Sequence, residues 1–368
     1  MREPRACAFF VRDNQGKQIP QRNRRVPRAV LLSFLVALPA AAHAQAPQPA
    51  PLQTNSAVTS TSPWLFAGFK RDSKDGVYYA ISLDGYHWKL ANSGKPVVPP
   101  TDSGELMRDP FLQRAPDDTF RMVWTWAWYE PQIIGYAESK DLITWTRHRK
   151  LPVMAAQPGA ANVWAPALYY EPTQKRWLIF WASTIPGRFP GDDTGEVATT
   201  PAGKVSLNHR IYSTTTTDFQ SFTPAKVFFD PGYSVIDATI LPPTEPGKPF
   251  TMVYKDERKT PLEKHLLTAT GPDFEGPWSN LSEPISETWS EGAAIIRVAD
   301  GYLAYYDHYS QGQHYGAIFS PDLVHWSDAL SKIDFPADMR HGSFLKITPV
   351  EYDRLAALTP TTRPGGSK

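Results

Sequence analysis

Met107-Arg108-Asp109-Pro110-Phe111 places a carboxylate at the start of an apolar, strand-forming segment. Four later segments repeat this arrangement, in which a short polar signature precedes a strand. The expected inner strands are Met107 to Arg114, Val163 to Glu171, Ser234 to Pro242, Thr288 to Val298 and Arg340 to Thr348. Elsewhere, short runs of β-branched and aromatic residues alternate with clusters of Gly, Pro and Asp, which is typical of strands and turns. The chain is therefore expected to be all-β.

A second repeat predicts the number of structural units. An Asp followed four or five residues later by an aromatic residue occurs five times, at intervals of 49 to 77 residues. The pairs are Asp84 and Trp88, Asp141 and Trp145, Asp218 and Phe222, Asp273 and Trp278, and Asp322 and Trp326. Such an Asp can cap a turn, while the aromatic side chain packs under an outer strand. The repeat predicts a single five-bladed β-propeller, closed by pairing of the N- and C-terminal segments.

Charge and composition argue against a nucleic-acid partner. The 368 residues include 38 Lys and Arg against 37 Asp and Glu, so no excess of charge attracts polyanions or anionic lipid. Aromatic residues make up 12% of the chain, with 12 Trp. Indole faces stack on sugar rings, although filling a β core explains the same residues equally well.

The N-terminal part of the chain carries two expected segments. Residues 1–44 resemble a secretory signal peptide with a long n-region, an apolar run and a cleavage site near Ala44. Residues 45–63 are rich in Pro, Ala, Ser and Thr, which predicts a flexible leader. The propeller is expected over residues 64–350, followed by a short tail over 351–368. We therefore expect a secreted or periplasmic protein that has no membrane association after cleavage of its signal.

The opening residues of the inner strands are candidates for one shared site. In a propeller these residues face a common central channel, and here they include Asp109, Asp237, Glu291 and His341. Taken singly, each has an ordinary structural explanation: an Asp-Pro turn, a hydrogen-bonded core residue, a solvated loop residue and a packed histidine. Together they suit glycoside hydrolysis, in which one carboxyl protonates the leaving oxygen and another activates water or attacks carbon.

The order of these motifs resembles glycoside hydrolase family 43 and its arabinase-like relatives, from about Trp64 to Thr348. That family has an Asp-Pro motif on the first inner strand, Trp-Ala-Pro on the second, Ile-Asp on the third and a Glu-Gly pair on the fourth. The resemblance implies a glycosidase in which Asp109 is the general base, Glu291 the general acid and Asp237 the residue that orients the acid and tunes its pKa. The implied reaction is a single displacement that inverts the anomeric configuration.

Several other residues are candidate substrate contacts. Trp124, Trp126 and Trp128 occupy alternate positions after the strand that carries the expected base. Of the three, Trp126 is the indole expected to border the sugar site. The candidate substrate-binding residues are Trp126, Trp164, Arg188, His308, Tyr309 and His341. Arg188 lies in the segment that leads into a large insertion, whereas His308 and Tyr309 are expected in a loop on the blade of the acid. No cofactor is expected to be required, while a structural calcium ion and a metal-ligand role for His341 stay open.

The sugar is less well defined than the reaction. Many relatives have Asp or Glu after Trp-Ala-Pro, where this chain has Ala167. The expected partner is an oligo- or polysaccharide of plant type that carries terminal α-L-arabinofuranosyl, β-D-xylosyl or β-galactosyl groups. An invertase-like enzyme would need Asn-Asp-Pro and Glu-Cys motifs, which the sequence lacks. The open alternatives are a glycan phosphorylase, which would need a basic cluster in the channel, and a carbohydrate-binding propeller without catalysis.

Overall fold

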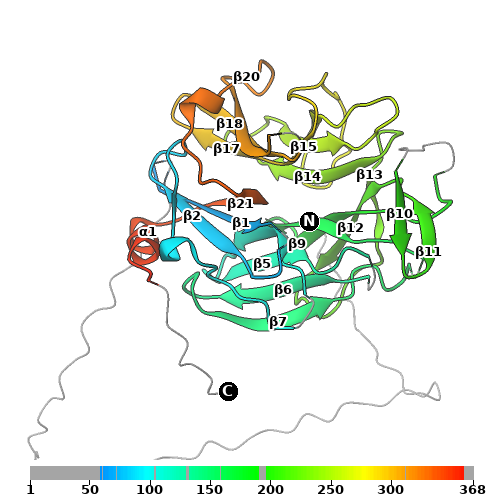
Figure 1. Cartoon of the computed structure of the whole chain (residues 1–368), viewed down its shortest axis with the longest axis horizontal. Helices are drawn as coiled ribbons and strands as arrows, with labels where there is room; N and C mark the ends of the chain where they lie inside the picture. The colour runs from blue at the N-terminus through cyan, green and yellow to red at the C-terminus, as the bar shows by residue number, and fades with distance from the viewer. Residues whose placement is uncertain are drawn as a thin grey trace, which may run out of the picture. The chain divides into compact units, whose positions relative to one another are not determined.

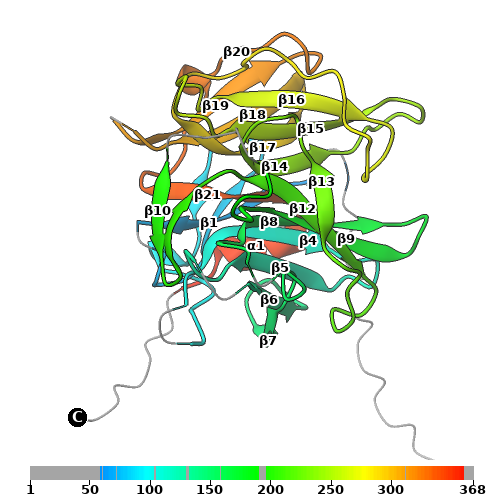
Figure 2. The same ribbon diagram turned by 90° about the vertical axis from the view of Figure 1, so that its right-hand side faces the viewer.

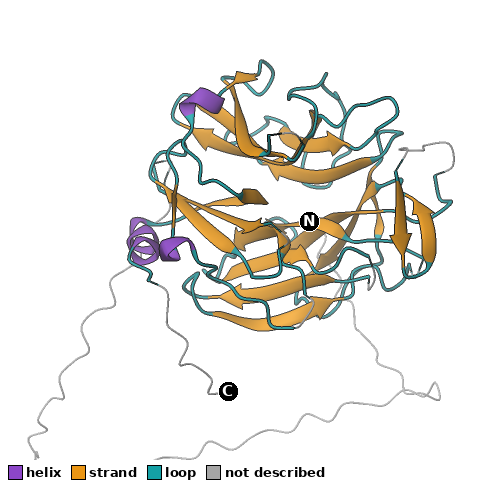
Figure 3. Ribbon diagram, viewed as in Figure 1, coloured by secondary structure: helices purple, strands orange, loops and turns teal. Residues whose placement is uncertain are grey.

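A computed structural model describes residues 59, 61–71, 73–102, 105–129, 132–157, 159–189, 196–310 and 312–359. The expected signal peptide and most of the expected leader lie outside the described residues. In the part of the chain that the structure describes, strands dominate (Figure 3), accompanied by one α-helix, α1 (Pro349–Ala356), and the 3₁₀ turns η1 (Asn92–Gly94) and η2 (Leu330–Lys332). The all-β prediction is confirmed.

Five antiparallel sheets form the blades of a five-bladed β-propeller, as predicted (Figure 1). The first blade contains β21 (Met339–Lys346), β1 (Trp64–Lys70), β2 (Tyr78–Ser82) and β3 (Lys89–Leu90). The second contains β4 (Arg108–Arg114), β5 (Phe120–Thr125), β6 (Ile134–Ser139) and β7 (Trp145–Leu151). The third contains β8 (Trp164–Glu171), β9 (Arg176–Ser183), β12 (Arg210–Thr216) and β13 (Lys226–Phe229).

The two remaining blades follow in chain order, and Figure 2 shows them stacked above the others. The fourth contains β14 (Val235–Leu241), β15 (Phe250–Asp256) and β16 (Leu266–Gly271). The fifth contains β17 (Ser290–Val298), β18 (Gly301–His308), β19 (His314–Ser320) and β20 (Ser327–Asp328). Part of the expected insertion forms a separate hairpin of β10 (Val197–Thr200) and β11 (Gly203–Ser206).

Strands β1 and β21 come from opposite ends of the folded domain and lie side by side (Figure 1). Their close approach depends on Gly342, because a Cβ atom there would stand 1.9 Å from the carbonyl oxygen of Ala67. Helix α1 follows β21 and begins with a capping box formed by Thr348 and Glu351. Glu351 also pairs with Arg114 of β4 at 2.6 Å, so this helix is tied to the second blade. The expected boundary between the propeller and the tail, after residue 350, falls inside α1.

The repeated Asp residues cap turns, as the sequence predicts. Asp84, Asp141, Asp218 and Asp322 each accept hydrogen bonds from the backbone N–H groups two and three residues further on, and Asp273 accepts one. The partner aromatics serve packing: Trp88 is buried, and the indole N–H of Trp145 donates to the hydroxyl of Tyr79 at 3.0 Å. This second repeat is therefore structural.

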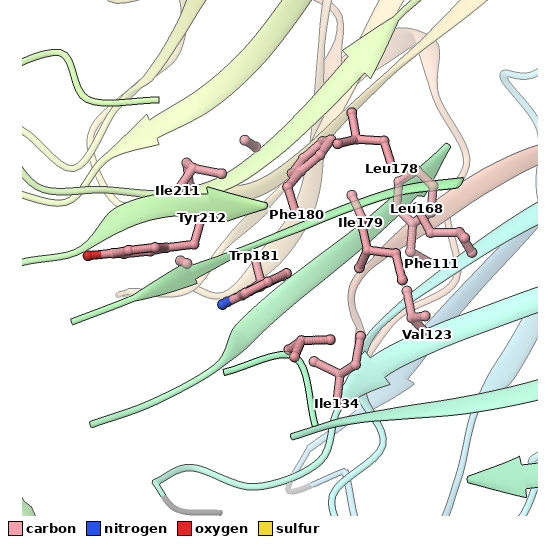
Figure 4. Packing of buried hydrophobic residues seen from close by; sticks show 14 of the residues in the cluster. Phe111, Val123, Ile134, Leu168, Leu178, Ile179, Phe180, Trp181, Ile211 and Tyr212 are labelled. Atoms are coloured by element: carbon pink, nitrogen blue, oxygen red, sulfur yellow. The ribbon is translucent and has the colours of Figure 1, made fainter. Parts of the chain in front are cut away.

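The largest apolar cluster joins the second, third and fourth blades. In Figure 4, Phe111, Val123 and Ile134 of the second blade face Leu168 and Ile179 of the third. Burial of apolar surface contributes roughly 25 cal/mol per Å². Because this packing fixes neighbouring blades against each other, it also fixes the starting points of their inner strands.

Candidate active site

A cavity of about 100 Å³ lies where the inner strands begin. Its lining residues are Arg108, Asp109, Thr125, Trp128, Trp164, Ile236, Asp237, Glu257, Glu291 and His341. The inner strands β4, β8, β14, β17 and β21 all contribute, so the five sequence signatures do converge. A larger depression of about 770 Å³ is formed by the β14–β15 connection and the end of β16, but Glu245 is the one carboxylate among its described lining residues. The chemistry is therefore concentrated in the smaller cavity.

A β-bulge in each inner strand turns the signature residues toward this cavity. In β4, β8, β14 and β17, two residues stand opposite one residue of the neighbouring strand, and β21 has one extra residue, His341, in its ladder with β1. The first bulged residues have left-handed backbone, with φ of 52° at Asp109, 47° at Ala165, 56° at Asp237 and 63° at Gly292. A bulge interrupts the alternation of side chains along a strand. Consecutive residues such as Arg108 and Asp109 can therefore line the same cavity.

The bulges arrange the signature residues in two tiers. The buried tier consists of the bulged residues, which are Asp109, Ala165, Asp237, Gly292 and His341. The outer tier consists of the residues that directly precede them, which are Arg108, Trp164, Ile236, Glu291 and Arg340, and all but Ile236 are partly exposed. The expected acid, Glu291, is thus not equivalent in position to Asp109 and Asp237. It lies one tier further out, because on β17 the bulge falls on the glycine that follows it.

Asp109, the expected base, is buried with both carboxylate oxygens engaged. The hydroxyl of Thr125 donates to Oδ2 at 2.7 Å, and Nδ1 of His341 lies 3.2 Å from Oδ1. Burial raises the pKa of Asp109, but the hydrogen bond and charge of His341, aided by Arg108 and Thr125, lower it to about 2. Asp109 is therefore ionised at any physiological pH.

Asp237 and His341 complete the buried tier. The backbone N–H of Gly292 donates to Oδ2 of Asp237 at 2.9 Å, and Nδ1 of His341 lies 3.9 Å from the same oxygen. Burial, together with the charges of Glu291 and Asp109, raises the pKa of Asp237 to about 6. Burial lowers the pKa of His341, but the charge of Asp237 and the hydrogen bond to Asp109 outweigh it and raise that pKa to about 9. At neutral pH, His341 is an imidazolium between two carboxyl groups.

Glu291 is held by two cations. Nζ of Lys255 donates to its Oε2 at 3.0 Å, and Nη2 of Arg340 donates to its Oε1 at 3.3 Å. Arg340 also pairs with Asp307, which is fully buried. The ring centroid of Tyr309 lies 4.3 Å from Nζ of Lys255, the cation that bonds to Glu291. Tyr309, a candidate substrate contact, does not itself line the cavity.

Sequence reasoning assigned no site role to the partners that the second strands of the second, fourth and fifth blades supply. The ladders place Thr125 opposite Arg108, Lys255 opposite Ile236 and Asp307 opposite Glu291. Each of these residues lies across from the residue that precedes a bulge. A polar residue near the end of a second strand is therefore the signal that could have identified them.

Three candidate contacts lie away from the cavity. Trp126 is only 9% exposed and packs in the core cluster of the first and second blades, whereas the indole that lines the cavity is that of Trp128, which is 48% exposed. Arg188 is exposed, and the central carbon of its guanidinium lies 5.5 Å from the ring centroid of Tyr212. His308 lies at the end of β18, not in a loop, and stacks on His314 with ring centroids 4.9 Å apart. Of the candidate substrate contacts, Trp164 and His341 line the cavity.

Three further observations bear on expectations from the sequence. Ala167 is fully buried in the core cluster and does not line the cavity. Across the described ranges, no group of three or more His, Cys, Asp or Glu side chains is arranged to hold a metal ion. The same residues include no helix with the length and apolarity needed to cross a membrane.

Fold and site together define a five-bladed propeller with a cluster of carboxyl groups at the start of its inner strands. Residues 61–353 match the model of the glycoside hydrolase family 43-related group, described as "Probable glycosyl hydrolase domain", and the chain belongs to that family. It is 29% identical over 196 residues to an α-L-arabinofuranosidase from Bifidobacterium longum subsp. longum. That match covers 47% of this chain but only 18% of the relative.

Two solved structures illustrate the range of similar folds. One is an exo-β-1,3-galactanase from Clostridium thermocellum, with 14% identity, a TM-score of 0.48 and coverage of 75% of this chain and 63% of that chain. Another is an α-L-arabinofuranosidase from Lactobacillus brevis, with 16% identity, a TM-score of 0.43 and coverage of 66% and 73%.

Proposed function

We propose that the protein is a glycoside hydrolase that removes terminal sugars from plant-type polysaccharides by an inverting single displacement. The observation that carries this proposal is the convergence of Asp109, Asp237 and Glu291 on one small cavity. The similarity to an α-L-arabinofuranosidase favours an α-L-arabinofuranosyl group as substrate, with β-D-xylosyl and β-galactosyl groups as further options. A cavity of about 100 Å³ suits a single terminal sugar better than the interior of a long chain.

Asp109 serves as the general base in the proposed reaction. Thr125 and His341 fix its carboxylate, and each oxygen keeps a further lone-pair direction for a water molecule. The water oxygen bonds to the anomeric carbon as the bond from that carbon to the leaving oxygen breaks. Asp109 takes the proton of the water, and the product sugar has inverted configuration.

Glu291 serves as the general acid and gives its proton to the leaving oxygen. It becomes a carboxylate in that step, and Lys255 and Arg340 already point their donors at its two oxygens. Charge that develops at a group surrounded by preorganised donors is stabilised without any rearrangement of the protein. Lys255 and Arg340 thus hold the carboxylate that forms on Glu291. None of these steps uses a metal ion or a cofactor.

Asp237 orients the acid through the backbone. Its carboxyl accepts the N–H of Gly292, the residue directly after Glu291. This bond holds the bulge that places Glu291 in the outer tier. The charge of Glu291 also contributes to the raised pKa of Asp237, which places the two carboxyl groups within electrostatic reach of each other.

The pairing of the cations favours hydrolysis over phosphorolysis. A phosphorylase needs a cluster of unpaired cations to bind phosphate, but Arg340, Lys255 and Lys264 all pair with carboxylates, which leaves Arg108 as a single cation at the cavity among the described residues. A carbohydrate-binding propeller without catalysis would not need the four carboxyl groups that line this cavity. The N-terminal sequence further leads us to propose that the enzyme acts outside the cytoplasm, as a secreted or periplasmic protein.

The test is hydrolysis of aryl α-L-arabinofuranoside, β-D-xyloside and β-D-galactoside, with the first-formed anomer detected by NMR. We expect turnover of at least one substrate with inversion, and a loss of kcat of about a thousandfold or more in Asp109→Asn and Glu291→Gln. Measurable sugar binding without turnover would favour the non-catalytic alternative. A retained anomer would rule out the single displacement, and an unchanged rate in Asp109→Asn would rule out its role as base.

A further inference from the structure

Arg108 differs from the other cations around the cavity. Arg340 and Lys255 bond to Glu291, Lys264 lies 2.6 Å from Glu257, and His341 lies 3.2 Å from Asp109. Among the described residues, Arg108 has no side-chain hydrogen bond and no carboxylate within ion-pair distance, although it lines the cavity. Its charge acts on Asp109 at longer range, but no carboxylate of the described residues binds its N–H groups directly.

Two aromatic rings hold this guanidinium in place. Its central carbon lies 4.3 Å from the ring centroid of Phe69 and 4.3 Å from that of Trp128. Phe69 is fully buried, and the indole N–H of Trp164 donates to the backbone oxygen of Trp128, which fixes the outer ring. Stacking occupies the faces of a guanidinium and leaves the N–H groups at its edge available. Arg108 thus presents a fixed set of donors with no acceptor from the described residues.

We propose that Arg108 binds a carboxylate group of the substrate, so that the sugar chain next to the scissile bond contains a uronic acid. A guanidinium edge matches a carboxylate with two parallel hydrogen bonds, which neutral hydroxyl groups cannot reproduce in strength. The inference rests on the proposed hydrolase function and defines the chemical class of its substrate.

The two tiers place this uronic acid on the leaving-group side. Glu291, which protonates the leaving oxygen, belongs to the outer tier, as does Arg108. Asp109, which activates the water on the opposite side of the sugar, belongs to the buried tier. The sugar that is cleaved therefore occupies the inner part of the cavity, and the sugar that leaves lies against the outer tier. Arabinofuranosyl, xylosyl and galactosyl groups carry no carboxylate, which agrees with a uronic acid on the leaving chain.

The test compares two forms of one acidic plant polysaccharide that carries the released sugar. One form keeps its carboxylates, and in the other they are reduced to primary alcohols. At pH 6, where uronic acids are ionised, we expect the wild-type kcat/KM to be at least about tenfold higher on the carboxylate form. Arg108→Ala should bring the ratio of the two values close to one, and Arg108→Lys should keep only part of the preference.

Arg121 provides the matched control. Its guanidinium also lies over two rings, those of Trp177 and Phe219, but it does not line the cavity. Arg121→Ala should keep the wild-type ratio. A wild-type ratio near one, or the same ratio in wild type and Arg108→Ala, would overturn the inference, while hydrolysis of neutral aryl glycosides would still support the hydrolase function.

Binding separates the two proposals if no glycoside is hydrolysed. Titration calorimetry with D-galacturonate and D-galactose then measures the carboxylate site directly. Galacturonate binding that is lost in Arg108→Ala and kept in Arg121→Ala would support the carboxylate site although the hydrolase proposal fails. Equal affinity for both sugars, or no binding of either, would overturn the carboxylate site as well.

Discussion

Nδ1 of His341 lies 3.2 Å from Oδ1 of Asp109 and 3.9 Å from Oδ2 of Asp237, so one imidazole stands between the two carboxyl groups of the buried tier. The histidine is the extra residue of the β21 bulge, while the two acids are bulged residues of β4 and β14. Electrostatic interactions of His341 with the two acids thus connect three inner strands at the centre of the propeller.

The first prediction concerns the pH dependence of folding stability. The folded-state pKa of His341 is about 9, above its ordinary value of 6.5. Its contribution is therefore fully present below pH 6.5 and is lost as the pH rises through 9. We expect His341→Gln to lower the free energy of unfolding by on the order of 3 kcal/mol at pH 6 and by much less at pH 9.5. Urea unfolding at both pH values measures this, and an equal loss at both would contradict the charged state of His341.

The second prediction concerns Lys255, which is 1% exposed and lies 2.7 Å from Glu257 and 3.0 Å from Glu291. Removing one member of a buried ionic cluster leaves its partners uncompensated, so Lys255→Met should destabilise the fold by about 3–5 kcal/mol. The same variant should reduce kcat, because the carboxylate that forms on Glu291 loses a donor.

Lys226 is the control for this prediction. It pairs with Glu275 at 3.2 Å, but its side chain is 63% exposed. Lys226→Met should change the free energy of unfolding by no more than about 0.5 kcal/mol. Similar losses in the two variants, measured by urea unfolding, would show that Lys255 has no special role.

The third prediction concerns Gly292, whose φ is 63° and whose substitution would place a Cβ atom 2.3 Å from Cγ of His341. Gly292→Ala should displace His341 from Asp109, lower kcat and cost roughly 2–4 kcal/mol of stability. Gly247 has a similar φ of 81° but no atom within 4 Å of such a Cβ. Gly247→Ala should therefore cost only about 1 kcal/mol and leave kcat unchanged. Equal effects of the two substitutions on kcat and thermal unfolding would contradict the contact with His341.

The sequence was sufficient to predict the propeller and several of the residues that line the candidate site. Asp109, Asp237 and Glu291 could be found because each belongs to a signature that repeats at the start of an inner strand. Lys255 and Thr125 could not, since their place in the site depends on the ladder that sets them opposite Ile236 and Arg108. Neither residue belongs to a sequence repeat.

The positions of the three indoles could not be predicted from the sequence for a different reason. The alternation of Trp124, Trp126 and Trp128 suggests one strand with a single apolar face. Strand β5 ends at Thr125, so only Trp124 belongs to it, and the two later indoles lie in the connection that follows. Side-chain alternation does not apply there, which is why Trp126 is in the core and Trp128 at the cavity.

The last prediction tests these two indoles against each other. Trp128 is 48% exposed beside Arg108, whereas Trp126 is 9% exposed in the core cluster. Trp126→Ala should destabilise the fold by about 3–5 kcal/mol, as expected for truncation of a large core side chain. Trp128→Ala should cost less than about 1 kcal/mol but lower kcat/KM by tenfold or more, because Arg108 loses the ring that fixes it at the cavity. Thermal unfolding and hydrolysis rates of both variants show which indole stabilises the fold and which acts in the sugar site. If Trp126→Ala keeps wild-type stability and loses activity, then Trp126 and not Trp128 is the indole of the sugar site.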